Sequence, residues 1–346
     1  MPAFKLRQLD LSFRTAYAQA KELARAQGAI PLLTAGNVQT ETRNGSRFVY
    51  RYRYDGAGKR IAEYLGPEGA AETVARMEAA QAAIRDSKTL SDYSRDLRRM
   101  GFYGADNSAL VTVAAMANAG LFANGAVLVG THAYGVILSD LGVTTPFMMT
   151  EDLDVARAAR IEIAALPKGG FLDLLKQSGL PFHEIPQLNP GKPTTSYKVR
   201  GQKLIVDLLV PTNGEPYAPV ELPELGAHAT GLPHLRYLLG KHSDSVLIGR
   251  DRIVPVAVPD AGRFCLHKLA LYSMRKASDA AKREKDVLQA ATLMAALSAD
   301  QDYVIDEAVD ALTLDLRKLL KSGAQRAREL LATDYGEAAD RLGALA

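Results

Sequence analysis

Two aspartates one residue apart are the residues of this sequence with the clearest chemical potential. They are Asp152 and Asp154, in the stretch TEDLDVA. On a β-strand, side chains alternate between the two faces, so both carboxylates would project from one face and Leu153 and Val155 from the other. Two carboxylates this close repel each other, and a divalent cation between them relieves the repulsion. Oxygen ligands of this kind suit Mg²⁺, so the pair is a candidate metal site.

A third aspartate interrupts an apolar strand further along the chain. Asp207 lies in GQKLIVDLLVP, where all the other residues from 204 to 210 are apolar. A charge in such a run needs a partner. If this strand lies beside residues 152–156, Asp207 completes a cluster of three carboxylates around two metal ions. Such a cluster suits phosphoryl or nucleotidyl transfer, in which the ions stabilise the developing charge.

A possible phosphate-binding turn lies upstream of the aspartate pair. The predicted strand GAVLVGT ends in Gly130 and Thr131, and we expect a loop-rich segment after it. The absent side chain of a glycine and the hydroxyl of a threonine let backbone N–H groups approach phosphate oxygens. These two residues are therefore candidates for binding the phosphates of a substrate.

Together, a strand ending in Gly-Thr, an Asp-x-Asp pair and a third aspartate on a later strand resemble the signature of the DNA polymerase β-like nucleotidyltransferase superfamily. The resemblance is closest to a bacterial branch of nucleotidyltransferase-fold proteins related to the AbiEii toxin type. The stretches EYLGPEG and RFCLHKLALYSMRKASDAAKREKDVLQAATLMAAL extend it over most of the chain. The chain departs from the pattern in two ways: Thr131 stands where serine is usual, and the segment between Thr131 and Asp152 is longer than in most members.

The resemblance implies a reaction and its participants. A nucleoside monophosphate would move from an NTP, such as ATP, to an acceptor hydroxyl, with release of pyrophosphate. Asp152, Asp154 and Asp207 would hold Mg²⁺ or Mn²⁺, Asp207 would also help to activate the acceptor, and Gly130 and Thr131 would bind phosphates. Three acceptors stay open: an RNA 3′ end, such as that of tRNA, as in toxin relatives; a protein hydroxyl; or a small molecule.

The C-terminal segment contains candidate cations for the triphosphate. Apolar periodicity predicts helices over residues 263–276 and 281–297. In AbiEii-type relatives a lysine contacts the triphosphate and an aspartate supports it, and these positions match Lys268 and Asp286. Three further basic residues could surround the phosphates: Lys282, Arg283 and Lys285. The alternative is a solvated helix face with i,i+4 pairs such as Lys282 with Asp286.

These candidates need a scaffold, and the chain suggests an α/β (α+β) fold in three parts. A nucleotidyltransferase core with a mixed β-sheet would span residues 106–258. An N-terminal helical region with a basic hairpin, residues 1–105, would precede it, and a C-terminal helical domain, residues 259–346, would close the nucleotide cleft. Helices in the first two parts are expected at about residues 14–27, 67–85, 90–100 and 108–121.

The N-terminal hairpin, residues 47–66, alternates aromatic and basic side chains around a glycine-rich turn at residues 55–58. Period-two alternation puts Phe48 and the tyrosines on one face and the arginines on the other. One interpretation packs the aromatic face on the core and leaves the arginines in water. The other uses the tyrosines and arginines to bind nucleic acid.

The composition limits the remaining classes of protein. The chain has 346 residues, 47% of them hydrophobic, and 42 basic against 39 acidic residues, a formal net charge of +3. This near balance neither requires nor excludes a polyanionic partner. The single cysteine, Cys265, excludes an internal disulfide framework. The first residues lack a signal-peptide core and no run approaches the ~20 apolar residues of a membrane span, so we expect a cytoplasmic protein without membrane contact. The oligomeric state stays open.

A second class of function also stays open. The fold could be kept for binding alone, as a nucleic-acid-binding or toxin–antitoxin interaction module that uses the basic hairpin and Arg95, Arg98 and Arg99. The three aspartates argue against this alternative, because a binding module gains nothing from carboxylates that repel one another. Among the six histidines no pair has zinc-site spacing, although His132, directly after the Gly-Thr, is a candidate for substrate contact.

Overall fold

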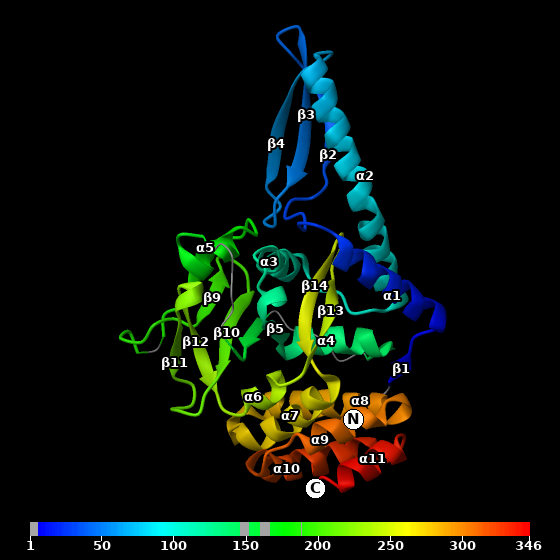
Figure 1. Cartoon of the computed structure of the whole chain (residues 1–346), viewed down its shortest axis with the longest axis vertical. Helices are drawn as coiled ribbons and strands as arrows, with labels where there is room; N and C mark the ends of the chain where they lie inside the picture. Colours follow the sequence, from blue (N-terminus) through cyan, green and yellow to red (C-terminus); the bar gives the residue numbers. More distant parts are fainter. Residues whose placement is uncertain (1–5, 146–151, 160–166, 188) are drawn as a thin grey trace.

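The computed structural model describes residues 6–145, 152–159, 167–187 and 189–346. The molecule is elongated, with three levels along its long axis (Figure 1). A projecting arm lies at one end, an α/β region lies in the middle, and a group of helices lies at the other end. The mixed α/β fold expected from the sequence is confirmed, while the domain boundaries at residues 105 and 258 stay predictions.

The arm consists of residues 37–100, which form three antiparallel strands and one long helix. Its elements are β2 (Asn37–Arg43), β3 (Ser46–Tyr54), β4 (Arg60–Pro67) and α2 (Ala71–Met100). Asn44 and Gly45 join β2 to β3 with φ values of 51° and 79°, the left-handed pair that a two-residue hairpin requires. The β3–β4 turn rests on the middle region, where the Asn107 side-chain amide donates a hydrogen bond of 3.2 Å to the Gly56 carbonyl.

The arm corrects three expectations. The hairpin gains a third strand, β2. The two helices expected at residues 67–85 and 90–100 are one helix, α2, which continues through the polar stretch DSKTLSD because those side chains lie exposed or half-buried. It ends at Gly101, whose φ of 103° a glycine adopts without strain.

The third correction concerns the two faces of the arm sheet. Val49 and Leu65 pack with Ala80 of α2, so α2 covers the face of the sheet that carries the odd-numbered residues of β3. The even-numbered aromatic residues of β3 therefore point away from the helix. The interpretation that packs the aromatic face on the core is wrong, because small aliphatic side chains fit closer under the helix than tyrosines do.

The middle region is built on a mixed sheet, seven-stranded in the described residues. Its main order is β11-β12-β10-β7-β5, and β9 pairs with β10 and with β8. Strand β10 pairs in parallel with β7 and with β12, and the other pairs of this sheet are antiparallel. The strands are β5 (Ala126–Val129), β7 (Asp152–Arg157), β8 (Phe182–Glu184), β9 (Ser196–Val199), β10 (Ile205–Pro211), β11 (Pro219–Leu222) and β12 (Ala227–Leu232).

A second layer packs beside this sheet. It contains the antiparallel pair β13 (His242–Ile248) and β14 (Ile253–Pro259) and the short pair β1 (Arg7–Gln8) and β6 (Val143–Thr144). The accompanying helices are α1 (Leu11–Ala26), α3 (Asn107–Asn118), α4 (Gly130–Leu141) and α5 (Gly170–Lys176). In the part of the chain that the structure describes, three short 3₁₀ turns lie elsewhere, at Phe122–Asn124, Pro223–Leu225 and Ala277–Asp279.

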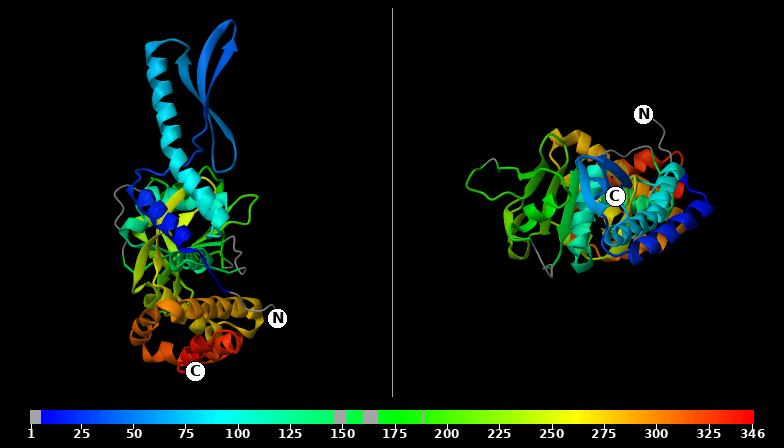
Figure 2. Two further views of the ribbon diagram at one scale, coloured as in Figure 1. Left: turned by 90° about the vertical axis from the view of Figure 1, so that its right-hand side faces the viewer. Right: turned by 90° about the horizontal axis from the view of Figure 1, so that it is seen from above.

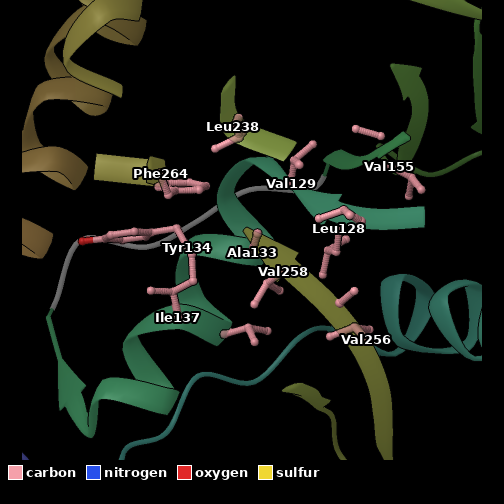
Figure 3. Close-up of a cluster of buried hydrophobic side chains, with 14 of the residues drawn as sticks. Leu128, Val129, Ala133, Tyr134, Ile137, Val155, Leu238, Val256, Val258 and Phe264 are labelled. Atoms are coloured by element: carbon pink, nitrogen blue, oxygen red, sulfur yellow. The ribbon is translucent and has the colours of Figure 1, made fainter. Parts of the chain in front are cut away.

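Helix α4 overturns the loop expected after the Gly-Thr. The strand β5 ends at Val129, and Gly130 and Thr131 already belong to α4. Most of this helix is buried, including Tyr134 at 1% exposure. Figure 3 shows Tyr134 beside Phe264 and among side chains of β5 and β14. A helix that is buried over most of its length is stabilised by packing, which outweighs the weak helix propensity of its two glycines.

The C-terminal helices form the third level. They are α6 (Leu235–Leu239), α7 (Ala261–Met274), α8 (Ala280–Asp300), α9 (Asp302–Asp310), α10 (Leu314–Leu331) and α11 (Gly336–Gly343). The Asp260 carboxylate accepts a hydrogen bond from the Arg263 N–H and so caps α7. Gly323 lets α10 approach α7, because a Cβ there would lie 2.2 Å from the Leu269 carbonyl oxygen. No helix within the described ranges has the length and apolar character needed to cross a bilayer.

Candidate functional site

The three predicted aspartates lie on neighbouring strands. Strands β7 and β10 pair in parallel, with Asp207 opposite Asp154 and Ile205 opposite Asp152. Residues opposite each other share a face, and alternation puts Asp152 on that face too. The expected pairing of these two strands is confirmed. Since neighbouring strands lie about 4.8 Å apart, the Asp154 and Asp207 side chains leave the sheet next to each other.

The electrostatics agree with this proximity. Burial, followed by the charge of Asp207, raises the pKa of Asp154 to about 6, although Lys268 opposes both effects. Burial also raises the pKa of Asp207, and Asp152 adds to this, while a hydrogen bond donated by the Ser196 hydroxyl acts in the opposite direction. The carboxylates therefore lie close enough to disfavour each other's charged form.

Gly130 makes room for one of these carboxylates. Its φ is +67°, and a Cβ added to it would lie 2.1 Å from Asp154 Oδ2. The sequence suggested that the missing side chain admits a phosphate, whereas the structure shows that it admits the Asp154 carboxylate. Gly130 also begins α4, and the free N–H groups of a helix start favour anions. Thr131 is buried, at 6% exposure.

Helix α7 brings a buried cation to the same place. Lys268 Nζ lies 2.7 Å from Asp286 Oδ1, and Arg275 Nε lies 2.5 Å from Asp286 Oδ2. Burial acts to raise the pKa of Asp286, but Lys268 and then Arg275 outweigh it and hold that pKa below its ordinary value. Asp286 is 2% exposed, so it holds both cations in a fixed arrangement.

Two more lysines face the carboxylates from α8. Burial lowers the pKa of Lys285, Lys268 lowers it further, and Asp286, Asp154 and Asp152 oppose them, so Lys285 lies near the aspartates. The charge of Lys282 acts to lower the pKa of Asp207. The alternative of a Lys282–Asp286 pair is not seen in the described residues, since Asp286 pairs with Lys268 and Arg275.

A pocket of about 220 Å³ lies between the sheet and α7. Gly130, Asp154, Lys268 and Arg275 contribute its polar wall. The remaining wall is mostly apolar: Val129, Leu209, Leu232, Pro233, Leu235, Leu238, Phe264, Leu271 and Met274, with Tyr217 and His267. The arrangement can accept a group that has a charged part near Lys268 and an apolar or aromatic part.

The three aspartates are the residues that could hold a divalent cation. Asp152, Asp154 and Asp207 offer hard oxygen ligands of the kind that Mg²⁺ and Mn²⁺ prefer, and their mutual repulsion would be relieved by a cation. Across the described ranges, no group of three or more His, Cys, Asp or Glu side chains is arranged as a metal site. The aspartates suit the cation by their chemistry and share one face by strand register, but the expected cluster of three carboxylates is not arranged to hold a metal ion in the described residues.

Other candidates from the sequence lie elsewhere or play other parts. The Arg283 guanidinium donates to the Tyr272 carbonyl and lies 4.1 Å from the centre of the Tyr272 ring, and its contact with the phosphates stays a prediction. His132 is 1% exposed and shares a hydrogen bond of 2.8 Å with the Tyr103 hydroxyl. Burial lowers the pKa of His132 to about 4. Its contact with a substrate stays a prediction.

Sequence reasoning missed two residues of this site, Ser196 and Arg275. Arg275 follows Lys268 by seven residues, two helical turns, and this spacing on one helix face was a usable signal. Ser196 gave no such signal. It reaches Asp207 because β9 pairs antiparallel with β10, with Ser196 directly opposite Asp207.

Comparisons with known proteins place the chain in a family. A search of curated proteins gave no significant match. Among solved structures, the chain is similar to an antigenic nucleotidyltransferase-like protein from Paracoccidioides brasiliensis, with 18% sequence identity over 62% of this chain and 91% of that chain. The TM-score of 0.30 is too low for this likeness to support a statement about fold or function. A family model described as nucleotidyltransferase matches residues 108–313, more than half of the chain. The aspartates on β7 and β10 and the Lys268–Asp286 pair all lie within that match, and the chain belongs to this nucleotidyltransferase family.

Proposed function

We propose that this protein is a metal-dependent nucleotidyltransferase that moves a nucleoside monophosphate from an NTP to an acceptor hydroxyl and releases pyrophosphate. One observation carries the proposal: Asp154 and Asp207 lie side by side on parallel strands, and Lys268 of α7 lines the same pocket as Asp154. Carboxylates beside a cluster of ammonium groups suit a substrate that brings both a divalent cation and phosphates.

Each group has a part in this proposal. Asp152, Asp154 and Asp207 would hold Mg²⁺ or Mn²⁺, which supplies charge stabilisation at the transferred phosphoryl group. Asp207 would also accept a proton from the acceptor hydroxyl, with Ser196 orienting its carboxylate. Gly130 and Thr131 would offer the start of α4 to the phosphates.

The cations would bind the triphosphate. Lys268 would neutralise it as a point charge, and Asp286 would position Lys268. Lys282 and Lys285 would extend this basic wall along α8 toward the aspartates.

An RNA 3′ end, such as that of tRNA, is the acceptor that we favour, because the sequence resembles the AbiEii toxin type. A toxin–antitoxin role would follow from the same resemblance. A protein hydroxyl and a small molecule are the other two acceptors, and the experiment below separates the three.

The test measures transfer of label from each α-³²P NTP, with Mg²⁺ or Mn²⁺, into the RNA, protein and small-molecule fractions of a bacterial lysate. Wild type is compared with Asp154→Asn and with Asp310→Asn, a control at an exposed aspartate on α9. We expect label with wild type and the control, and a loss of about a thousandfold with Asp154→Asn, since the metal-bound site contributes several kcal/mol. Equal transfer by wild type and Asp154→Asn would refute the proposed site.

The alternative is a protein that keeps the fold for binding alone. The exposed aromatic residues of the arm favour it, and the repulsion between Asp154 and Asp207 counts against it. Such a protein would label no fraction with any NTP, yet would bind its partner equally well with Asp154→Asn.

A further inference from the structure

The arm sheet presents an aromatic face that its own helix leaves open. We define the aromatic face as the side chains of Phe48, Tyr50, Tyr52 and Tyr54 on β3, Tyr64 on β4, and the flanking Arg43 and Arg60. The opposite face of the sheet packs on α2 through Val49 and Leu65. Figure 1 and the left view of Figure 2 show the sheet projecting beyond the middle region, with α2 alone beside it.

The rings form a continuous strip across two strands. Tyr50 lies opposite Tyr64 in the β3–β4 pairing, and their ring centres are 5.4 Å apart. The centres of Phe48 and Tyr64 are 6.1 Å apart, and those of Tyr50 and Tyr52 are 6.0 Å apart. Tyr54 is 45% exposed and Tyr64 is 51% exposed, Phe48 and Tyr50 are half-buried, and Tyr52 is buried at 5% exposure. Exposed rings gathered in one place indicate a binding surface more than rings scattered singly.

Arginines lie over this strip. The Arg60 guanidinium is 3.7 Å from the centre of the Tyr52 ring, and that of Arg43 is 4.9 Å from the centre of the Tyr50 ring. Arg43 also pairs with Glu41. Arg60 is exposed, its charge acts on Glu41 without forming an ion pair among the described residues, and it can contact a ligand that lies along the rings.

The positive charge of the protein is concentrated in this sheet. Residues 37–67 contain six basic and three acidic residues, a net charge of +3, which equals that of the whole chain. Helix α2, on the other face, contains six basic and five acidic residues and is close to neutral. The sheet therefore suits a polyanion.

Aromatic rings and arginines on an open sheet face suit one class of polyanion. Unpaired bases stack on the rings and phosphates contact the arginines, whereas a duplex keeps its bases inside and offers nothing to the rings. An acidic protein segment would use the arginines but would leave the strip of rings exposed. We propose that the aromatic face of the arm binds single-stranded nucleic acid, whether or not the carboxylate site transfers nucleotides.

The test measures fluorescence anisotropy of labelled single-stranded RNA of about 12 nucleotides, within the length that one such surface covers. Single-stranded DNA of the same sequence and the corresponding duplexes are measured in parallel. The variants are Tyr54→Ala/Tyr64→Ala, which removes the two most exposed rings, and Arg60→Glu, which keeps both rings. The controls are Tyr303→Ala and Lys321→Glu, at exposed positions on α9 and α10.

We expect wild type to bind single strands more tightly than duplexes. The tyrosine double variant should bind at least about tenfold more weakly, since stacking of a base on a ring contributes on the order of 1–3 kcal/mol. Arg60→Glu should weaken binding several-fold and reduce the dependence on salt. The two controls and Asp154→Asn should bind like wild type, which separates this surface from the proposed active site.

Three results would overturn the proposal. They are the absence of binding to either kind of single strand, duplex binding as tight as single-strand binding, and arm variants that bind like wild type. Circular dichroism and thermal unfolding verify that each variant is folded. The two arm variants act on different groups, so a folding defect in one leaves the other informative. If the protein binds no nucleic acid, the partner of this face is expected to be another protein.

Discussion

The carboxylate site and the arm both carry charge, but they are assembled in opposite ways. The site gathers Asp154, Asp207, Lys268 and Asp286 from elements far apart in the sequence, and burial raises the pKa values of Asp154 and Asp207 there. The arm forms from consecutive strands and one helix, and it leaves Tyr54, Tyr64 and Arg60 exposed to solvent.

This difference separates two kinds of chemistry. Groups that must carry out proton or phosphoryl transfer gain from burial, because low dielectric strengthens their interactions. Groups that bind a long, flexible polymer gain from exposure, because the polymer must reach them in an extended form. Single substitutions should therefore lower the stability of the protein more in the site than in the arm.

The largest effect on folding is expected at the buried ion pair of the site. Lys268→Met leaves the Asp286 carboxylate with Arg275 as its remaining ionic partner, and it should lower the free energy of unfolding by about 3 kcal/mol. Urea denaturation measures this change. Lys321→Met, at an exposed position, should change it by less than about 0.5 kcal/mol. If both variants have the same free energy of unfolding, the Lys268–Asp286 ion pair does not stabilise the fold, which would contradict the prediction.

A pH effect should follow from His132. Its pKa in the folded protein, about 4, lies below the ordinary value of 6.5, because burial disfavours the charged ring. The neutral ring thus contributes stability above pH 6.5, and this contribution is lost as the pH falls toward 4. Between pH 7 and pH 5 the loss should be about 2 kcal/mol. His132→Gln should show a stability that depends less on pH by this amount in urea titrations, and an unchanged pH dependence would contradict the assignment.

A smaller effect on stability, with a clear effect on transfer, is expected at Gly130. In Gly130→Ala a left-handed alanine costs about 1–2 kcal/mol, and its Cβ displaces the Asp154 carboxylate. Thermal unfolding measures the first effect and NTP labelling the second, for which we expect a loss of at least about tenfold. Gly336→Ala has open space around its Cβ and is the control. Transfer at the wild-type rate would show that Asp154 has room to move.

The smallest effect should come from the arm turn. Gly45 has a φ of +79° and open space around it, so Gly45→Ala should cost about 1 kcal/mol by backbone strain alone. Hydrogen exchange should show faster opening of β2 and β3, with no change near β7 and β10. Gly28→Ala, at a position with open space and no left-handed φ, is the control. Faster exchange in both regions would mean that the arm and the site unfold together.

Several elements could be predicted from local patterns. Alternating residues around a glycine-rich turn predicted the strands β3 and β4, and apolar periodicity predicted α7 and α8. Helix α4 could not be found in this way. Its glycines suggest a loop, and only packing against β5, β14 and α7 makes the helix stable.

The candidate site was predicted in part. The types of residue pointed to Asp152, Asp154, Asp207 and Lys268, and the pairing of β7 with β10 was expected. Ser196 could not be found, because its approach to Asp207 depends on the register of β9 against β10.

The sequence by itself determined which side chains share a face and which chemistry they could support, because alternation along a strand is a local property of the backbone. The tertiary structure decided which face is buried. It packed Val49 and Leu65 under α2 and left Tyr54 and Tyr64 exposed, and it brought the lysines of α7 and α8 to the aspartates. The physical reason is that burial depends on contacts between distant segments, and no pattern within one strand contains them.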